Sequence, residues 1–153
     1  MVTAKECLEG LRNMRIRLPK LERDIKELKA KLYTLRAIDY SKERITGGKP
    51  SDLSDEICRY NEKLGNAKAE WQRLEKYADA VDEMIDSIPS EPLRALLHER
   101  YVNCGSWEQV AMVCGVSREW VRRRLHPKAL REFSKVYKKE LAELAVVGIW
   151  YML

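Results

Sequence analysis

The sequence has little of what strand-rich proteins, membrane proteins and zinc sites require. Its 153 residues include one Phe and seven Gly, too few for a fold with many strands and tight turns. No stretch approaches the ~20 apolar residues of a membrane span, and the opening MVTAKECLEG lacks the apolar core of a signal peptide. Four Cys and two His occur without a C-x-x-C pair, so we expect no metal site.

Residue sets that perform catalysis are also missing. No acid pair and no nucleophile–base set stands out, and the two histidines, His98 and His126, are expected to be surface or phosphate-contacting side chains. We therefore predict a protein that is not an enzyme and uses no cofactor.

Charge, by contrast, is abundant. Charged residues make up 35% of the chain, which suits long solvent-exposed helices. The net charge of +5 suits an anionic partner, although a mild basic excess is weak support on its own. We therefore expect an all-α protein and look for the place where the positive charge gathers.

Apolar residues in the N-terminal half recur at alternating spacings of three and four, the pattern of a coiled-coil seam. The first series is Leu11, Met14, Leu18, Leu21, Ile25, Leu28, Leu32 and Leu35. The second series is Leu53, Ile57, Tyr60, Leu64, Ala67, Trp71, Leu74, Ala78, Val81, Ile85 and Ile88. Two long helices with buried seams are predicted, preferably as an antiparallel hairpin within one chain; pairing between two chains would satisfy the same pattern.

Three features interrupt this pattern. The segment 39–50, with Gly47 and Gly48, lacks periodicity and predicts a connecting loop, after which Ser51 or Asp52 can cap the second helix. Pro19 cannot donate a backbone hydrogen bond, so the first helix should be kinked there or divided near Lys20. Gly65 and Asn66 could stop the second helix, but the unbroken seam predicts only a weak point.

Residues 90–133 predict three or four short helices. Ser90 can cap the first, which has Pro92 in its opening turn and runs to about Val102. Ser106 caps a second helix from Trp107 to Cys114. Ser117 caps a third from Arg118 to about His126, which Pro127 should end.

The spacing of Ala111, Gly115 and Val121 predicts a helix-turn-helix. A small residue lets the two helices cross closely, glycine allows a left-handed turn, and the apolar Val121 packs back on the first helix. The remaining core positions are assigned to Val110, Cys114 and Val116. An ordinary three-helix bundle would share part of this pattern.

Positive charge gathers on and after the third helix. Residues 118–139 contain nine basic and two acidic side chains, a local net charge of +7. Because this basic run begins at the second helix of a helix-turn-helix, it indicates contacts with DNA phosphates and base edges. This interpretation is preferred to that of a solvated surface without a partner. The predicted DNA-contacting residues are Ser117, Arg118, Glu119, Trp120, Arg122, Arg123, Arg124, Lys128, Arg131 and Lys135.

Two groups within this set have separate predicted roles. The first turn and the exposed side of the third helix should meet bases, and Trp120 could equally pack in the core. Lys128, Arg131, Lys135 and Lys138 follow at spacings of three and four, so they share one helical face and could hold the DNA backbone.

The segments LLHERYV, SWEQVA, GVSREWV and KALREF resemble region four of bacterial sigma factors. They are closer still to the sigma-region-four-like regulators of phages and prophages, such as the ArpU-type late regulators. This resemblance implies a sigma-region-four-like domain that binds double-stranded DNA in the major groove, contact with RNA polymerase, and regulation of phage genes in the bacterial cytoplasm. Arg124 and Pro127 depart from the sigma pattern.

We therefore expect an antiparallel coiled-coil hairpin in residues 1–88, a helix-turn-helix domain in 89–133, and a helix with an apolar tail in 134–153. The preferred function is a sequence-specific transcription regulator. A phage small terminase subunit and a polymerase-binding adaptor without DNA contact remain alternatives. Nine of the last ten residues are apolar or aromatic, so the tail should be buried, against the hairpin or in a homodimer rather than in a membrane.

Overall fold

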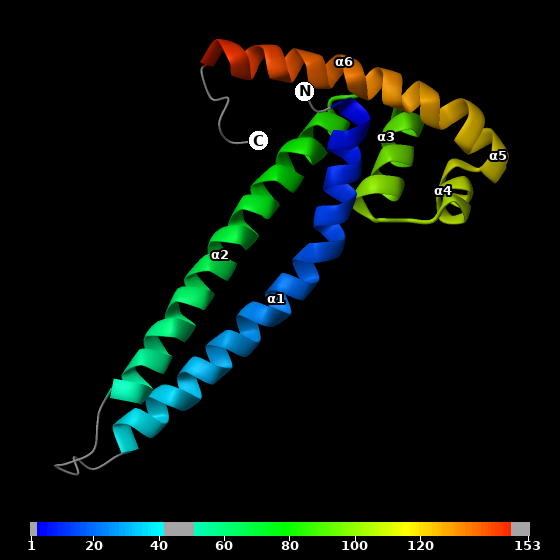
Figure 1. The fold of residues 1–153 in the computed structure, drawn as a ribbon. Helices are drawn as coiled ribbons and strands as arrows, with labels where there is room; N and C mark the ends of the chain where they lie inside the picture. The colour runs from blue at the N-terminus through cyan, green and yellow to red at the C-terminus, as the bar shows by residue number, and fades with distance from the viewer. Residues whose placement is uncertain (1–2, 42–50, 148–153) are drawn as a thin grey trace. The chain divides into compact units, whose positions relative to one another are not determined.

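The computed structural model describes residues 3–41 and 51–147, with side chains for 3–38 and 53–141, and is helical throughout, without a strand in those ranges (Figure 1). The prediction of an all-α fold is confirmed. Residues 39–41, expected in the loop, belong to the first helix, and the rest of that segment lies outside the described residues. Residues 148–153 of the apolar tail also lie outside them, so its burial stays a prediction.

The chain divides into two compact units. Unit 2 is Arg17–Leu74, and unit 1 combines Met1–Ile16 with Glu75–Leu153. This division differs from the functional domains expected from the sequence, which stay a prediction.

Unit 2 consists of the later part of α1 (Ala4–Ser41) and the earlier part of α2 (Ser51–Asp86), which run side by side in opposite directions (Figure 1). Leu18, Leu32 and Leu74 are buried, whereas the other seam residues of this unit are half-buried. Two helices alone can cover only one face of each other, which explains the partial burial. Arg17 and Glu70 form an ion pair of 2.6 Å between the helices.

Pro19 does not divide the first helix. The helix α1 continues from Ala4 to Ser41 with Pro19 inside it, so the expected division near Lys20 does not occur. Proline removes one backbone donor, but the buried Leu18 on one side and the half-buried Leu21 on the other keep the seam in phase. Gly65 likewise lies within the continuous α2, as the unbroken seam predicted.

Unit 1 packs the start of α1 and the end of α2 against the C-terminal helices. These are α3 (Glu91–Leu97), η1 (His98–Val102), α4 (Trp107–Cys114), α5 (Arg118–Trp120), η2 (Val121–Leu125) and α6 (His126–Val147). The largest fully buried side chains are Leu8, Leu11, Val81, Ile85, Ile88, Leu93, Leu96, Leu97, Val110, Val121 and Phe133. One apolar core therefore joins helices that are far apart in sequence.

The predicted end of the third helix at Pro127 is wrong. The helix passes from α5 through the π-helical η2 directly into α6, in which Pro127 is the second residue. In this wider turn the backbone N–H of His126 donates to the carbonyl of Val121, five residues earlier. The π-helical turn changes the spacing of the backbone hydrogen bonds just before Pro127. The helix therefore continues although Pro127 has no backbone N–H to donate.

None of the helices in the described ranges is both long and apolar enough to cross a membrane.

Candidate nucleic-acid interface

The first helix of the predicted helix-turn-helix begins with a capping box. The backbone N–H of Gln109 donates to the Ser106 hydroxyl, at 3.3 Å, and the Ser106 N–H donates to Gln109 Oε1, at 2.7 Å. These two bonds satisfy backbone donors that a helix start otherwise leaves free. The capping box therefore sets the start of α4 at Trp107, as the sequence predicted from Ser106.

The turn after α4 has the chemistry that the sequence predicted. Gly115 has φ of 65° and ψ of 28°, the left-handed conformation that glycine adopts without strain, and its N–H bonds back to α4. The Ser117 hydroxyl then accepts a hydrogen bond of 3.2 Å from the Trp120 N–H and caps α5. Turn and cap together place α5 directly after α4.

Core contacts set which side of α5 and η2 faces outward. Val110 and Val121 are fully buried and Ala111 is 9% exposed, which agrees with their predicted packing. Val116 is 37% exposed and does not fill the core position assigned to it, because the left-handed turn at Gly115 directs the chain outward. Cys114 is only partly buried against the core.

Every predicted DNA-contacting residue is exposed. Trp120 is 52% exposed, so it does not pack in the core. The exposed set comprises Ser117, Arg118, Glu119, Trp120, Arg122, Arg123, Arg124, Lys128, Arg131 and Lys135. The structure thus brings the ten residues onto one uninterrupted helical stretch and its cap, where their side chains are accessible to a partner.

Three of these cations have acidic partners. Arg118 on α5 reaches Glu108 on α4 at 2.5 Å, and the backbone of Glu108 together with Arg118 lowers the pKa of Glu108. Arg123 pairs with Glu119 and Lys135 with Glu132, each at 2.8 Å. Both side chains of the Arg118 and Arg123 pairs are exposed, as is Lys135, whereas Glu132 is 31% exposed. Exposed ion pairs are weak, so a phosphate can compete for these cations.

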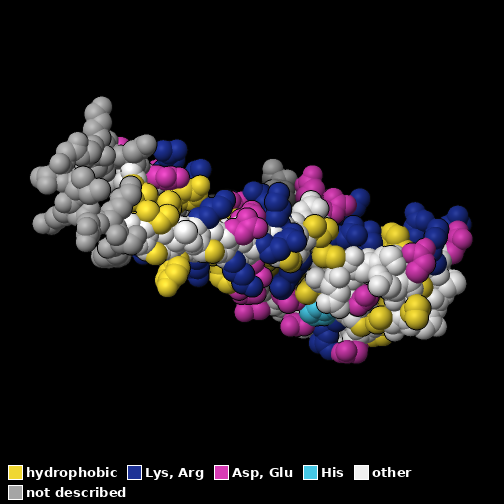
Figure 2. Space-filling view, turned by 90° about the horizontal axis from the view of Figure 1, so that it is seen from below, with side chains coloured by type: hydrophobic (Ala, Val, Ile, Leu, Met, Phe, Trp, Pro, Cys, Tyr) yellow, Lys and Arg dark blue, Asp and Glu magenta, His cyan; other side chains and the backbone are white. Residues whose placement is uncertain are grey.

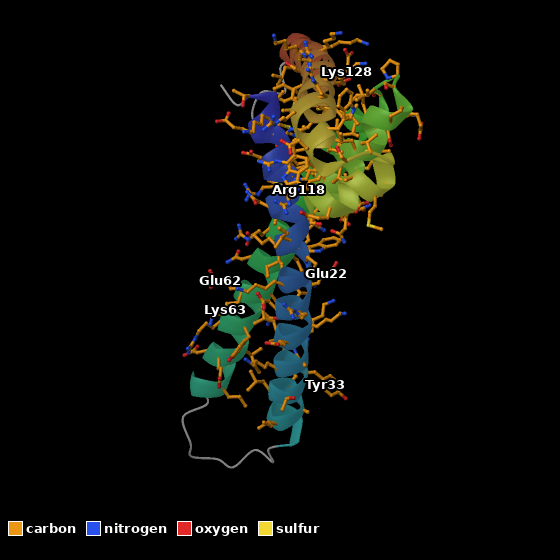
Figure 3. The ribbon with its side chains drawn as sticks, turned by 90° about the vertical axis from the view of Figure 1, so that its right-hand side faces the viewer. Glu22, Tyr33, Glu62, Lys63, Arg118 and Lys128 are labelled. Atoms are coloured by element: carbon orange, nitrogen blue, oxygen red, sulfur yellow. The ribbon has the colours of Figure 1, made fainter. Side chains whose placement is uncertain are left out.

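Five further cations form no ion pair with the side chains described in residues 3–38 and 53–141: Arg122, Arg124, Lys128, Arg131 and Lys138. Figure 2 shows some Lys and Arg side chains at the right-hand edge, where Figure 1 places α5, beside acidic and uncharged side chains. Figure 3 labels Arg118 and Lys128, which lie apart on unit 1. The basic residues are therefore spread along α5, η2 and α6 and are not gathered at one point.

An apolar patch beside this basic surface was not predicted. Met112 is 81% exposed and Val113 is 56% exposed, both on α4, and Val116 and Trp120 follow on the turn and α5. Apolar side chains next to a reading helix could contact thymine methyl groups. Sequence periodicity gives no signal for such a patch, because these residue types usually indicate a core.

The two histidines contact side chains of the chain itself, and the expected contact with a phosphate stays a prediction. His98 contacts Asp82 through Nδ1 at 3.2 Å and Asp86 through Nε2 at 2.8 Å. His126 is half-buried, with Nε2 2.8 Å from the Tyr101 hydroxyl and its ring edge-on to Trp107. Both partners are distant in sequence, so no local motif marked them.

Within the described ranges no cluster of His, Cys, Asp and Glu could hold a metal ion. Comparison of the chain with known protein families, with curated proteins and with solved structures finds no match.

Proposed function

We propose that the chain is a sequence-specific DNA-binding regulator of transcription, with α4, the Gly115 turn and α5–η2 as its helix-turn-helix. The observation that carries the proposal is the exposed basic face of α5, η2 and α6, held outward by the buried Val121 and Ala111. In this arrangement α5 and η2 enter the major groove, and Arg122 meets a base edge or an adjacent phosphate.

The cations of α6 form the second part of the proposed interface. Lys128, Arg131, Lys135 and Lys138 are exposed on the helix that continues from η2, without a break at Pro127. We call these four residues the backbone clamp. Each phosphate contact should add to affinity for any DNA sequence and to its dependence on salt.

The N-terminal hairpin is proposed to be a coiled coil within one chain. The resemblance of the C-terminal segment to sigma region four supports phage genes as the regulated genes and RNA polymerase as a second partner.

The test is DNA binding by the full chain, first by selection from random duplexes and then by fluorescence anisotropy on the selected site. Arg122→Ala should weaken binding to that site by about 1–3 kcal/mol if the side chain contacts a guanine. Arg23→Ala, an exposed arginine on α1, is the matched control and should bind as the wild type does. Failure to select any sequence would reject sequence-specific regulation.

The backbone clamp is tested by salt titration. Replacing all four residues by Ala should weaken specific and non-specific binding alike and flatten the slope of log K against log salt by about 0.9 for each lost contact. An unchanged slope would exclude the clamp. Salt-independent or absent DNA binding by the wild type would favour the adaptor, and a ring in native mass measurements would favour the small terminase subunit.

A further inference from the structure

Unit 1 contains a cavity of about 370 Å³, lined in part by the first residue of α4 and the first residue of α6. Its lining comes from α1, η1, α4 and the start of α6: Lys5, Glu9, Arg12, Asn13, Arg100, Tyr101, Trp107 and His126. The volume falls at the lower end of the roughly 300–1,000 Å³ typical of small-molecule sites. No contact in the proposed DNA interface uses these side chains.

The cavity wall has an excess of positive charge. Three cations face one carboxylate, and the Lys5 ammonium already lies 3.6 Å from the Glu9 carboxylate. The guanidinium groups of Arg12 and Arg100 also line the cavity. No lining residue supplies a second carboxylate to pair with them. Burial and the charge of Arg12 both lower the pKa of Arg100, which shows that the two groups repel each other.

The two arginines differ in how they are held. Arg100 stacks on the Trp107 ring, 4.2 Å from its centroid, and its Nη1 donates a 2.8 Å hydrogen bond to the Gly105 carbonyl. The Nε of Arg12 is buried and has no hydrogen-bond partner among the residues that the structure describes. Arg12 nevertheless lines the cavity, so its positive charge attracts an anion bound there.

The remaining wall is neutral and polar. Burial raises the pKa of Tyr101 to about 12, and burial together with Arg100 lowers the pKa of His126 to about 4. Near neutral pH both groups are therefore uncharged and hydrogen-bonded to each other. They neither repel an anion nor neutralise the arginines.

We propose that this cavity binds a small phosphate-bearing anion, held between Arg12 and Arg100 with Lys5 at its edge. A phosphate dianion matches two guanidinium charges and offers oxygens for paired hydrogen bonds. The size of the cavity suits a free phosphate or a small phosphate monoester.

Binding here would reach the DNA-binding segment directly. Trp107 is the first residue of α4, and His126 is the first residue after η2, so the cavity touches both ends of the helix-turn-helix. An anion that binds only the folded chain stabilises it in proportion to its concentration and affinity. A bound anion therefore stabilises the contact between the start of α1 and the helices that are proposed to bind DNA.

The experiment titrates inorganic phosphate into the full chain without DNA and follows heat and the thermal midpoint, with sodium chloride at equal ionic strength as the reference. We expect saturable binding and a rise in the midpoint. Arg12→Gln should weaken phosphate binding at least tenfold, and Lys5→Gln should weaken it less, because Lys5 is exposed and paired with Glu9. Arg23→Gln on the same helix should bind phosphate as the wild type does.

A separate measurement distinguishes a binding role of Arg12 from a structural one. In phosphate-free buffer Arg12→Gln should melt at the same temperature as the wild type or higher, because the substitution removes a repelling charge. A lower midpoint, or no saturable phosphate binding by the wild type at millimolar concentration, overturns the proposal.

DNA affinity separates the two sources of phosphate. Without free phosphate, Arg12→Gln should leave DNA binding unchanged, since the site takes a small molecule. A loss of DNA affinity in that variant would show that Arg12 meets a backbone phosphate and would overturn the small-anion site. Neither outcome depends on whether Arg122 contacts bases.

Discussion

Acidification should destabilise unit 1 through His126. Its Nε2 lies 2.8 Å from the Tyr101 hydroxyl, and its ring packs edge-on against Trp107 with centroids 4.9 Å apart. Burial, followed by Arg100 and Lys5, lowers its pKa from 6.5 to about 4, and only Glu9 opposes the shift. The folded chain therefore resists a proton that the unfolded chain accepts.

The sign and size of the effect follow from this difference. Stability is full above the unfolded pKa of about 6.5 and falls as the pH drops from there toward about 4. Linkage gives a loss of about 2 kcal/mol at a pH of about 5 for a fully shielded ring. Because His126 keeps some solvent contact, we expect a loss of about 1–2 kcal/mol.

Urea unfolding followed by circular dichroism, between a pH of about 7.5 and about 5 in phosphate-free buffer, measures this loss. His126→Gln cannot titrate but keeps a polar group beside Tyr101, so its stability should change less over the same interval. The pKa values of Glu6 and Glu108 lie below the ordinary 4.5, so these groups titrate at lower pH. Their contribution is the same in both proteins and does not affect the comparison. Parallel pH curves for the two proteins would refute the assignment to His126.

Further substitutions test the packing and the turn. Phe133→Ala, at a fully buried site, should lower the free energy of unfolding by about 3–5 kcal/mol, as measured by urea unfolding. A loss of less than about 1 kcal/mol would mean that Phe133 does not pack in the core. Leu74→Asp should reduce the helix content measured by circular dichroism, because it places a charge at a buried position. Tyr33→Asp, at a position that is 79% exposed (Figure 3), should not. Equal effects of the two substitutions would contradict the burial of the seam between the helices. Gly115→Ala should cost about 1 kcal/mol through its φ of 65° alone, since a Cβ there meets nothing within 4 Å. Ser106→Ala should cost a similar amount, about 1 kcal/mol, by removing the cap, and an unchanged melting temperature would contradict that role.

Local chemistry explains what the sequence predicted correctly. The seam residues of α1 and α2 are all buried or half-buried, since a repeat of three and four residues keeps them on one helical side. Ser106, Gly115 and Ser117 were predictable because caps and left-handed turns need particular side chains at particular positions.

Features that depend on tertiary contact were missed. The cavity joins Lys5 and Arg12 to Arg100 and His126, and no local pattern relates positions so far apart. The helix does not end at Pro127, because the rule that proline breaks a helix assumes regular α-helical hydrogen bonding, which η2 does not follow. The exposure of Val116 depends on the direction of the turn and not on its own hydrophobicity.

The separation of exposed and buried faces on α5, η2 and α6 has an evolutionary consequence. Val121, Ala129 and Phe133 anchor this stretch, whereas Arg118, Arg122 and their exposed neighbours contribute nothing to the core. Substitutions on the exposed face can therefore accumulate at small cost to stability. If this face binds DNA as proposed, a lineage carrying this scaffold acquires a new operator by changing a few exposed side chains, while selection for folding continues to act on the other face alone.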